Sequence, residues 1–442
     1  MNAWRDLVTA SLIGTERALV PEVSIPGVAP GEDGAGDPAA VLLDRAAMAT
    51  AARRAGRRPD HAEPLPECER DPRPAVSPAA AGRLARMLSG QYPGLLDEWL
   101  MAVMAGGLRL PPQFLPVLLD RARRSPADAG LRRLVTEAGG PRARWLAGLN
   151  PDWAFVTAPA QHGPEAWRLG DTGQRRSYLA GLLAADPGAA RDLITAGWAA
   201  APAAERTMFL SVLGGQLGPP DEPLLEAALA DRSPDVRAWA AYLLARLPGS
   251  ALGRRMAERA LRCVRIEPGD GGGRLAVTPP AERDDSMRRD GIPPAPAAPG
   301  APRPDQSRLL LEIVTRTPLG AWTAASGLDP AQLVAMPAGD WAPLLFTGWA
   351  RAAAAQQDRV WTDALIRHMI AAGSGGTAAQ LQAFRELARQ ASPALGAPGT
   401  LPEPGPDTPP VIRAVLSALR FRWDMLEELG QLEELGHDDN GD

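Results

Sequence analysis

Apolar residues recur at helical spacing through most of this chain, and most clearly between residues 221 and 247. In the first half of that stretch, Leu224 and Leu225 begin the apolar face of an amphipathic helix. In the second half, Ser233 is a favourable N-cap, and Pro234 follows at the first helical position, where its missing N–H costs no hydrogen bond. The pattern predicts two short antiparallel helices joined by a tight turn.

A single helical hairpin cannot bury its own apolar face, so it must pack against neighbouring units. The same rhythm of helices separated by turns that contain proline or glycine runs through residues 79–266 and 306–392. No segment of comparable length alternates apolar and polar residues as a half-buried strand does. The sequence therefore predicts an all-α protein built from stacked helical hairpins.

Stretches rich in proline and glycine interrupt this rhythm and divide the chain. We expect a helix over residues 38–55, a pair of helices over 131–139 and 141–149, and a short extended piece at Leu275–Val277. The predicted order is N-terminal helices with proline-rich loops over 1–78, a helical repeat array over 79–266 that includes the repeat 221–247, a Pro/Gly-rich insertion over 267–305, C-terminal helical repeats over 306–392, a proline-rich linker over 393–410, and a terminal helix with a tail over 411–442.

Four stretches resemble a known family. Residues 231–247, D-R-S-P-D-V-R-A-W-A-A-Y-L-L-A-R-L, resemble the second half of a HEAT-type repeat. Together with L-I-G-T-E-R at 12–17, R-W-L-A-G-L-N-P-D-W at 144–153 and M-R-R-D-G-I at 287–292, they are similar to an uncharacterised bacterial family of HEAT-like proteins. The resemblance implies a HEAT-like solenoid with no assigned activity. Members of that family are often encoded near MoxR-type AAA+ ATPases and SWIM-type zinc-finger proteins, which implies an adaptor role with an AAA+ ATPase as partner.

Composition limits the chemistry that this chain can perform. All 47 basic residues are arginine, so the lysine of a P-loop and Schiff-base chemistry are excluded. The two cysteines, Cys68 and Cys263, are far apart, and the four histidines lack the spacing of a zinc site. We therefore expect no metal, no cofactor and no enzymatic activity.

Charge and hydropathy restrict the partners. The net charge of −5 argues against a general nucleic-acid-binding protein. The first residues lack the basic and apolar regions of a signal peptide, and no stretch approaches the roughly 18 consecutive apolar residues that a membrane-spanning helix needs. We expect a cytoplasmic protein that binds no membrane.

The most distinctive stretch outside the repeat is the charged segment E-R-D-D-S-M-R-R-D-G-I, residues 282–292. Four interpretations fit it: a bridge between repeats, a loop docked on a concave face, a contact for a partner, or a solvated loop. Its candidate partner-binding residues are Asp284, Asp285, Arg288, Arg289 and Asp290.

A basic stripe is predicted on the helix expected over residues 251–265. Arg255, Arg259 and Arg262 share one face of that helix at intervals of three and four residues. This face is either solvated or a contact for phosphate or for an acidic partner. The three arginines are therefore candidate partner-binding residues.

Two smaller sites complete the candidates. Trp153, in the turn N-P-D-W, is expected to be an exposed anchor. Eight other tryptophans recur about once per hairpin and suit the core: Trp99, Trp145, Trp167, Trp198, Trp239, Trp341, Trp349 and Trp361. Glu16 and Arg17 follow the glycine that ends the first helix. They form either a partner contact or a capped helix end with an ion pair.

These observations favour a non-enzymatic scaffold or adaptor that binds another protein. The alternative is a nucleic-acid-binding HEAT-like solenoid, such as a DNA glycosylase-like enzyme, for which Trp239 and the arginines of 254–265 would supply the contacts. A basic stripe repeated along successive repeats would favour the alternative, and a mixed or apolar groove would favour the adaptor.

Overall fold

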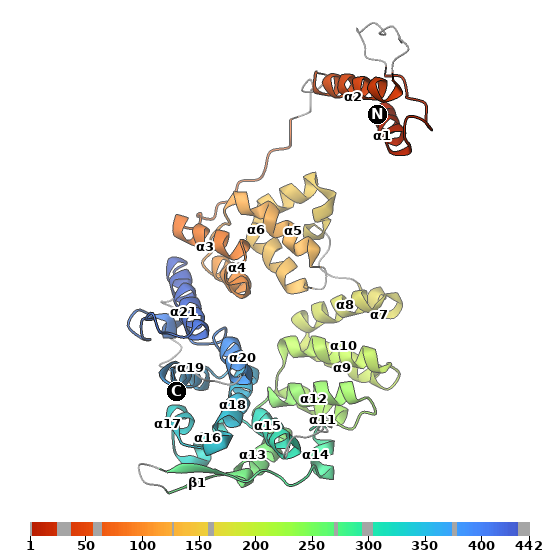
Figure 1. Cartoon of the computed structure of the whole chain (residues 1–442). Helices are drawn as coiled ribbons and strands as arrows, with labels where there is room; N and C mark the ends of the chain where they lie inside the picture. The colour runs from red at the N-terminus through yellow and green to blue at the C-terminus, as the bar shows by residue number, and fades with distance from the viewer. Residues whose placement is uncertain are drawn as a thin grey trace. The chain divides into compact units, whose positions relative to one another are not determined.

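The computed structural model describes residues 2–23, 37–55, 64–125, 128–157, 163–268, 273–293, 304–373 and 378–431. The chain forms two compact units, Met1–Glu67 and Cys68–Asp442, whose helices and strands are labelled in Figure 1. The predicted tail after residue 431 and parts of the predicted loops, at 24–36, 56–63, 269–272 and 294–303, lie outside the described residues.

The first unit is a pair of helices, α1 (Asn2–Ile13) and α2 (Pro38–Ala55), that contact each other. Their apolar faces bury Leu7, Ala10, Leu42 and Ala49. The helix predicted over residues 38–55 is confirmed with these bounds.

The second unit contains the remaining helices. They are α3 (Pro78–Leu88), α4 (Leu96–Ala105), α5 (Leu115–Arg124), α6 (Ala129–Leu149), α7 (Pro164–Leu169), α8 (Thr172–Ala185), α9 (Pro187–Trp198), α10 (Ala203–Leu213), α11 (Glu222–Ala228), α12 (Pro234–Ala245), α13 (Ala251–Cys263), α14 (Asp285–Arg289), α15 (Pro304–Arg316), α16 (Leu319–Ser326), α17 (Pro330–Ala335), α18 (Ala342–Gln356), α19 (Arg359–Ala371), α20 (Ala378–Leu387) and α21 (Pro410–Glu428). The all-α prediction is confirmed, as are the two helices predicted within residues 221–247, which are α11 and α12.

Two short strands accompany the helices in the described part of the chain. β1 (Val264–Glu267) pairs antiparallel with β2 (Arg274–Val277), with Val264 opposite Val277. The extended piece predicted at Leu275–Val277 is therefore confirmed. The helix expected over 251–265 ends two residues early, because the chain enters β1 after Cys263.

Buried apolar side chains of the second unit form two clusters. The smaller cluster lies among α3, α4, α5 and α6 and includes the fully buried Trp99. The larger cluster extends from α8 to α20 and includes Phe209 and Trp361. Helix α21 belongs to both, because Ile412 and its neighbours as far as Leu419 pack in the larger cluster, whereas its second half packs in the smaller one. Residues 79–266 therefore do not share a single core.

Two ion pairs attach α21 to the first helices of this unit. Arg83 of α3 lies 2.8 Å from Glu428, and Arg422 lies 2.8 Å from Glu98 of α4. Arg422 also donates to the backbone carbonyl of Ala391, just before the 3-10 helix η7 (Pro393–Gly396). Because η7 packs on α21, the linker predicted over 393–410 begins as a buried part of the fold.

Arginine–carboxylate pairs also join elements that lie one hairpin apart between α8 and α12. They are Arg175–Glu205 at 2.6 Å, Arg191–Asp221 at 2.7 Å and Arg206–Asp231 at 2.9 Å. The members of each pair are 25 to 30 residues apart in sequence, so each pair connects one helical hairpin to the next. Arg206 and Asp231 are both buried, which makes the loss of either partner costly.

Helix α6 is kinked at Gly140, at the break predicted between residues 131–139 and 141–149. Gly140 has φ 55° and ψ −142°, and Pro141 follows it without a backbone N–H to donate. Arg73 donates to the carbonyl of Ala138 at 3.1 Å and so supplies a hydrogen bond at the break. The two predicted helices are thus the two segments of α6.

None of the described helices combines the length and the apolar character that crossing a bilayer requires.

We predict that Gly140→Ala destabilises the second unit by about 2–3 kcal/mol. The added Cβ would lie 2.3 Å from Nη2 of Arg73, and the positive φ disfavours any residue with a side chain. Urea unfolding monitored by circular dichroism measures the change. Gly82→Ala is the matched control: this exposed glycine of α3 has open space around it, so the substitution should stabilise the helix by about 0.5–1 kcal/mol. Equal midpoints for wild type and Gly140→Ala would contradict the prediction.

Candidate functional site

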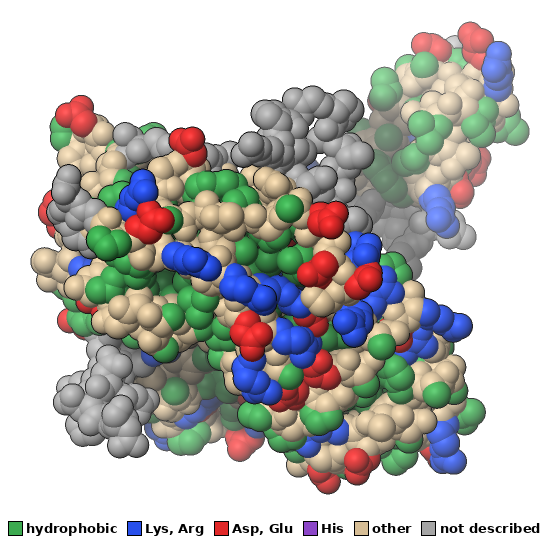
Figure 2. All heavy atoms as spheres, turned by 90° about the horizontal axis from the view of Figure 1, so that it is seen from below, with side chains coloured by type: hydrophobic (Ala, Val, Ile, Leu, Met, Phe, Trp, Pro, Cys, Tyr) green, Lys and Arg blue, Asp and Glu red, His purple; other side chains and the backbone are tan. Residues whose placement is uncertain are grey.

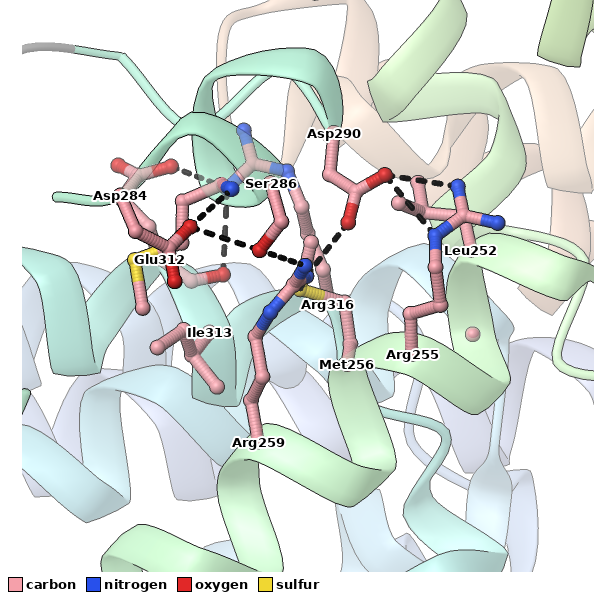
Figure 3. Close-up of polar contacts among 12 residues, drawn as sticks. Leu252, Arg255, Met256, Arg259, Asp284, Ser286, Asp290, Glu312, Ile313 and Arg316 are labelled. Carbon is pink, nitrogen blue, oxygen red and sulfur yellow. Dashed lines mark hydrogen bonds and ion pairs between the residues drawn. The ribbon is translucent and has the colours of Figure 1, made fainter.

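The charged segment 282–292 is attached to α13 by a buried carboxylate. Asp290 lies between two guanidiniums of that helix, 2.8 Å from Arg255 and 2.6 Å from Arg259, as Figure 3 shows. Asp290 and Arg259 are both buried. Two of the predicted basic-stripe residues and one predicted loop residue therefore bind each other.

Helix α11 supplies a second carboxylate to this cluster. Glu226 lies 3.1 Å from Arg255 and also accepts a hydrogen bond from the backbone N–H of Leu252 at 3.0 Å, near the start of α13. Burial opposes the charge of Arg255, but hydrogen bonds with Asp290 and Glu226 outweigh it and raise the pKa of the guanidinium. Arg255 thus stays protonated and links α11, α13 and the segment.

The short helix α14 begins at a strong N-cap. Asp284 accepts from the backbone N–H of Met287 and from the hydroxyl of Ser286, each at 2.7 Å. These two hydrogen bonds, with the positive charge of Arg259 nearby, lower the pKa of Asp284. Arg259 in turn donates to Ser286 at 3.0 Å, which joins the cap to the buried ion pairs.

Apolar and glycine residues of M-R-R-D-G-I complete the attachment. Met287 and Ile292 are buried in the larger core cluster. Gly291 has φ 73°, and a Cβ at this position would lie 2.8 Å from Ala241 of α12. The segment therefore bridges α11, α12 and α13, which is the first of the four interpretations drawn from sequence.

None of the remaining arginines of the segment is paired with a buried carboxylate in the described chain. Nε of Arg283 is buried and has no hydrogen-bond partner in the part of the chain that the structure describes. Burial lowers the pKa of Arg283, and the positive charges of Arg288 and Arg237 lower it further. Arg288 is exposed and paired with the exposed Asp285, and Arg289 is exposed without a carboxylate partner among the described residues.

We call Arg237, Arg283, Arg288 and Arg289 the arginine surface. Figure 2, seen from the side on which α13–α16 and β1 lie in Figure 1, shows a band of arginine side chains with acidic side chains among them. Arg288 of this surface is paired with Asp285, whereas Arg237, Arg283 and Arg289 have no carboxylate partner among the described residues. Neighbouring guanidinium groups without such partners favour the approach of an anionic group. This arrangement can bind a negative ligand or protein surface.

The structure places the other predicted candidates elsewhere. Arg262 is exposed on α13 and donates to the carbonyl of Glu258 at 3.1 Å. Glu16 and Arg17 are exposed in the first unit, after α1 ends at Gly14 with φ 93°, and no ion pair joins them. Among the described residues, the buried ion pair considered for this capped helix end is therefore not present.

The expectation that Trp153 is an exposed anchor is wrong. Its side chain is half-buried against the smaller core cluster, and its indole N–H donates to Asp120 of α5 at 3.0 Å. Conversely Trp239, proposed from sequence to be core, is 36% exposed and contacts Tyr242 edge to face. The surrounding helices, rather than the spacing, decide which indole is covered.

Two members of the arginine surface were missed by the sequence analysis. Arg283 lies within the singled-out segment, but only its position beside Arg237 of α12 shows that its charge is uncompensated. In sequence, Arg237 is simply part of the HEAT-like D-V-R triplet. It donates to the carbonyls of Asp231 and Arg232 at 2.7 and 3.1 Å.

Within the described residues, no cluster of three or more His, Cys, Asp or Glu side chains could hold a metal ion. In segment 282–292, Asp290 and Asp285 are engaged in ion pairs, and Asp284 caps α14.

An apolar cavity of about 280 Å³ lies at a second place, among α18, α19, α20 and α21. It is lined by Pro343, His368, Met369, Leu381 and Ile412, among others. Burial lowers the pKa of His368, so the imidazole is favoured in its neutral form.

A family model described as "Family of unknown function (DUF5691)" matches residues 6–424. The chain belongs to this family. Neither a curated protein nor a solved structure matches the chain.

We predict that Asp290→Asn destabilises the second unit by about 3 kcal/mol, because it leaves Arg259 buried without its carboxylate. Hydrogen exchange should show loss of protection in residues 286–292, and urea unfolding should show the lower stability. Asp285→Asn, which removes an exposed ion pair of the same segment, should cost less than about 1 kcal/mol. Equal effects of the two substitutions would show that the buried pairs do not hold the segment.

His368 predicts a pH dependence of stability. Its pKa is lowered in the folded protein, so the unfolded chain binds more protons below its ordinary pKa of about 6.5. Stability should therefore fall as pH decreases through that value. His368→Gln should reduce the slope of unfolding free energy against pH between about 7 and 5. An unchanged slope would mean that His368 titrates normally in the folded state.

Proposed function

We propose that the protein is a HEAT-like α-solenoid that acts as a non-enzymatic cytoplasmic adaptor and binds an acidic protein partner through the arginine surface. The observation that carries the proposal is the division of charge in segment 282–292. Asp290 holds the segment on α13 through buried ion pairs, whereas Arg283 and Arg289 carry charge that nothing in the described chain neutralises.

A rigid attachment suits a recognition surface. Because Met287 and Ile292 are buried and Asp284 caps α14, the guanidinium groups project from a fixed backbone. Fixing a binding residue before the partner arrives reduces the conformational entropy lost on association. An arginine presents five donors in a planar fork and pairs with carboxylates in a bidentate manner.

The order of helix contacts supports the solenoid part of the proposal. α8 packs on α10, α10 on α12, α12 on α13, α13 on α15 and α15 on α18, so each helix contacts one that follows closely in sequence. The arginine–carboxylate pairs from α8 to α12 join neighbouring hairpins at similar separations. Such stacking is typical of repeat proteins that bind other macromolecules.

The partner that the family resemblance implies is an AAA+ ATPase of the MoxR type. For a site of this kind, the complementary surface on the partner would carry clustered Asp and Glu side chains. The arginine surface gives this proposal a specific place to test.

The arrangement of charge makes the nucleic-acid alternative weaker. Of the arginines that would have lined a basic groove, Arg255 and Arg259 are neutralised by Asp290 and Glu226. Phosphate-backbone binding depends on several free cationic groups in a row. We therefore keep nucleic acid as an outcome of the experiment and not as a second proposal.

We predict that charge reversal of Arg288 and Arg289 to Glu abolishes capture of a stoichiometric protein partner by the tagged protein from its native cytoplasm. Each like-charge contact introduced into an acidic interface should weaken binding by about tenfold or more. Capture is done at low and moderate salt, and the bound protein and nucleic acid are both measured.

Arg168→Glu with Arg176→Glu is the matched control, because both residues are exposed, lie on α7 and α8 and form no ion pair within the described chain. This variant has the same net charge and should retain the partner. Retention of the partner by the Arg288/Arg289 variant would remove the arginine surface from the interface. Nucleic acid captured at low salt and lost steeply as salt rises, without a protein partner, would overturn the adaptor proposal.

A further inference from the structure

A polar cavity of about 250 Å³ lies beside the kink of α6, in a part of the second unit that the arginine surface does not include. Its walls come from residues 68–71, from residues 109–115 and from Gly139 and Arg142 at the kink. Three arginines line it: Arg70, Arg109 and Arg142.

Positive charge exceeds negative charge around this cavity. Asp71 is bound by Arg73, whose Nη2 lies 2.7 Å from a carboxylate oxygen, and Glu69 lies 4.0 Å from Arg144. These pairs account for both carboxylates of the cavity wall. The three arginines that line the cavity, Arg70, Arg109 and Arg142, have no carboxylate partner in the described chain.

Asp71 does not offset this surplus by changing its protonation. Side-chain hydrogen bonds from Arg73 lower the pKa of Asp71, in opposition to burial, and the charge of Arg109 adds to the effect. Asp71 is therefore ionised at neutral pH, and its charge is already matched by Arg73.

The backbone around the cavity is fixed in place. The N–H of Arg109 donates to Pro74 at 2.8 Å, and Arg73 donates to Ala138 at 3.1 Å, so residues 71–76 are joined to both other walls. The second segment of α6 starts at Pro141, beside the cavity, and the positive end of its dipole adds to the charge of Arg142. The geometry is built before any ligand arrives.

We propose that this cavity binds a phosphate group, either free or carried by a small phosphomonoester. Guanidinium groups bind phosphate oxygens in bidentate pairs, and three of them match a dianion better than a single carboxylate. The volume lies below the roughly 300–1,000 Å³ of pockets that enclose drug-sized ligands, so a phosphate with a short substituent fits and a whole nucleotide does not.

Cys68 gives the experiment a direct reporter. It lines the cavity and is half-buried with a free thiol, whereas Cys263, the other cysteine of the chain, is buried elsewhere. The rate of Cys68 alkylation is measured by mass spectrometry in the full-length protein. Inorganic phosphate, glycerol 3-phosphate or acetate is added at constant ionic strength, and calorimetry measures binding in parallel.

We predict that phosphate compounds bind and slow alkylation of Cys68, whereas acetate does not. Stronger binding of glycerol 3-phosphate identifies a phosphomonoester site, and stronger binding of inorganic phosphate identifies a site for the free ion. Arg109→Gln with Arg142→Gln should weaken binding by at least about tenfold, since each substitution removes a guanidinium that would donate charge-assisted hydrogen bonds to the phosphate. Arg168→Gln with Arg176→Gln controls for the net-charge change and should bind normally.

Arg70→Gln tests the site with the least disturbance of α6 and should also weaken binding, which keeps the test valid if the double variant fails to fold. The absence of both heat and protection with either phosphate compound would overturn the proposal. Binding that survives in Arg109→Gln/Arg142→Gln and in Arg70→Gln would equally overturn it.

Discussion

The second unit depends on one helix that two cores share. Helix α21 lies nearly at the C-terminal end of the described chain, yet its first half belongs to the larger core cluster and its second half to the smaller one, and it packs with η7, α20, α3 and α4. Arg83 and Arg422 form ion pairs between α21 and the helices α3 and α4. Removal of this helix would expose apolar surface in both clusters at once, so the first and last helices of the unit must fold together.

Buried arginine–carboxylate pairs then set the positions of the helices between them. Arg206–Asp231 and Arg259–Asp290 are shielded from water, and such pairs specify one arrangement because any shift leaves a charge without its partner. In segment 282–292, some charged groups hold the fold through buried ion pairs, and other charged groups have no partner in the described chain. Asp290 holds the segment on α13, whereas Arg283 and Arg289 have no carboxylate partner among the described residues.

The two proposed binding sites of the second unit share one arrangement of charge. Near α14, Asp290 is paired with Arg255 and Arg259, and beside the kink of α6, Asp71 is paired with Arg73. At both places neighbouring arginines, such as Arg289 and Arg142, have no carboxylate partner among the described residues. Because the chain contains no lysine, every such site presents a guanidinium, which favours planar, bidentate anions. The two sites differ in enclosure: the first is a surface suited to a protein, and the second is a cavity suited to a small ligand.

The amino-acid sequence by itself determined the local elements. Helical periodicity, Ser233-Pro234 and the glycine-proline pair at 140–141 are short-range signals, and they gave α11, α12, α2 and the break in α6 correctly. It also marked residues 282–292 and the arginines of α13 as unusual. Only the tertiary structure decided which charges neutralise one another, that Trp153 is half-buried with its indole N–H bonded to Asp120 while Trp239 is more exposed, and that α21 packs on α3 and α4. These outcomes depend on contacts between residues tens to hundreds of positions apart, such as Arg83 with Glu428, and no local pattern encodes such a pairing.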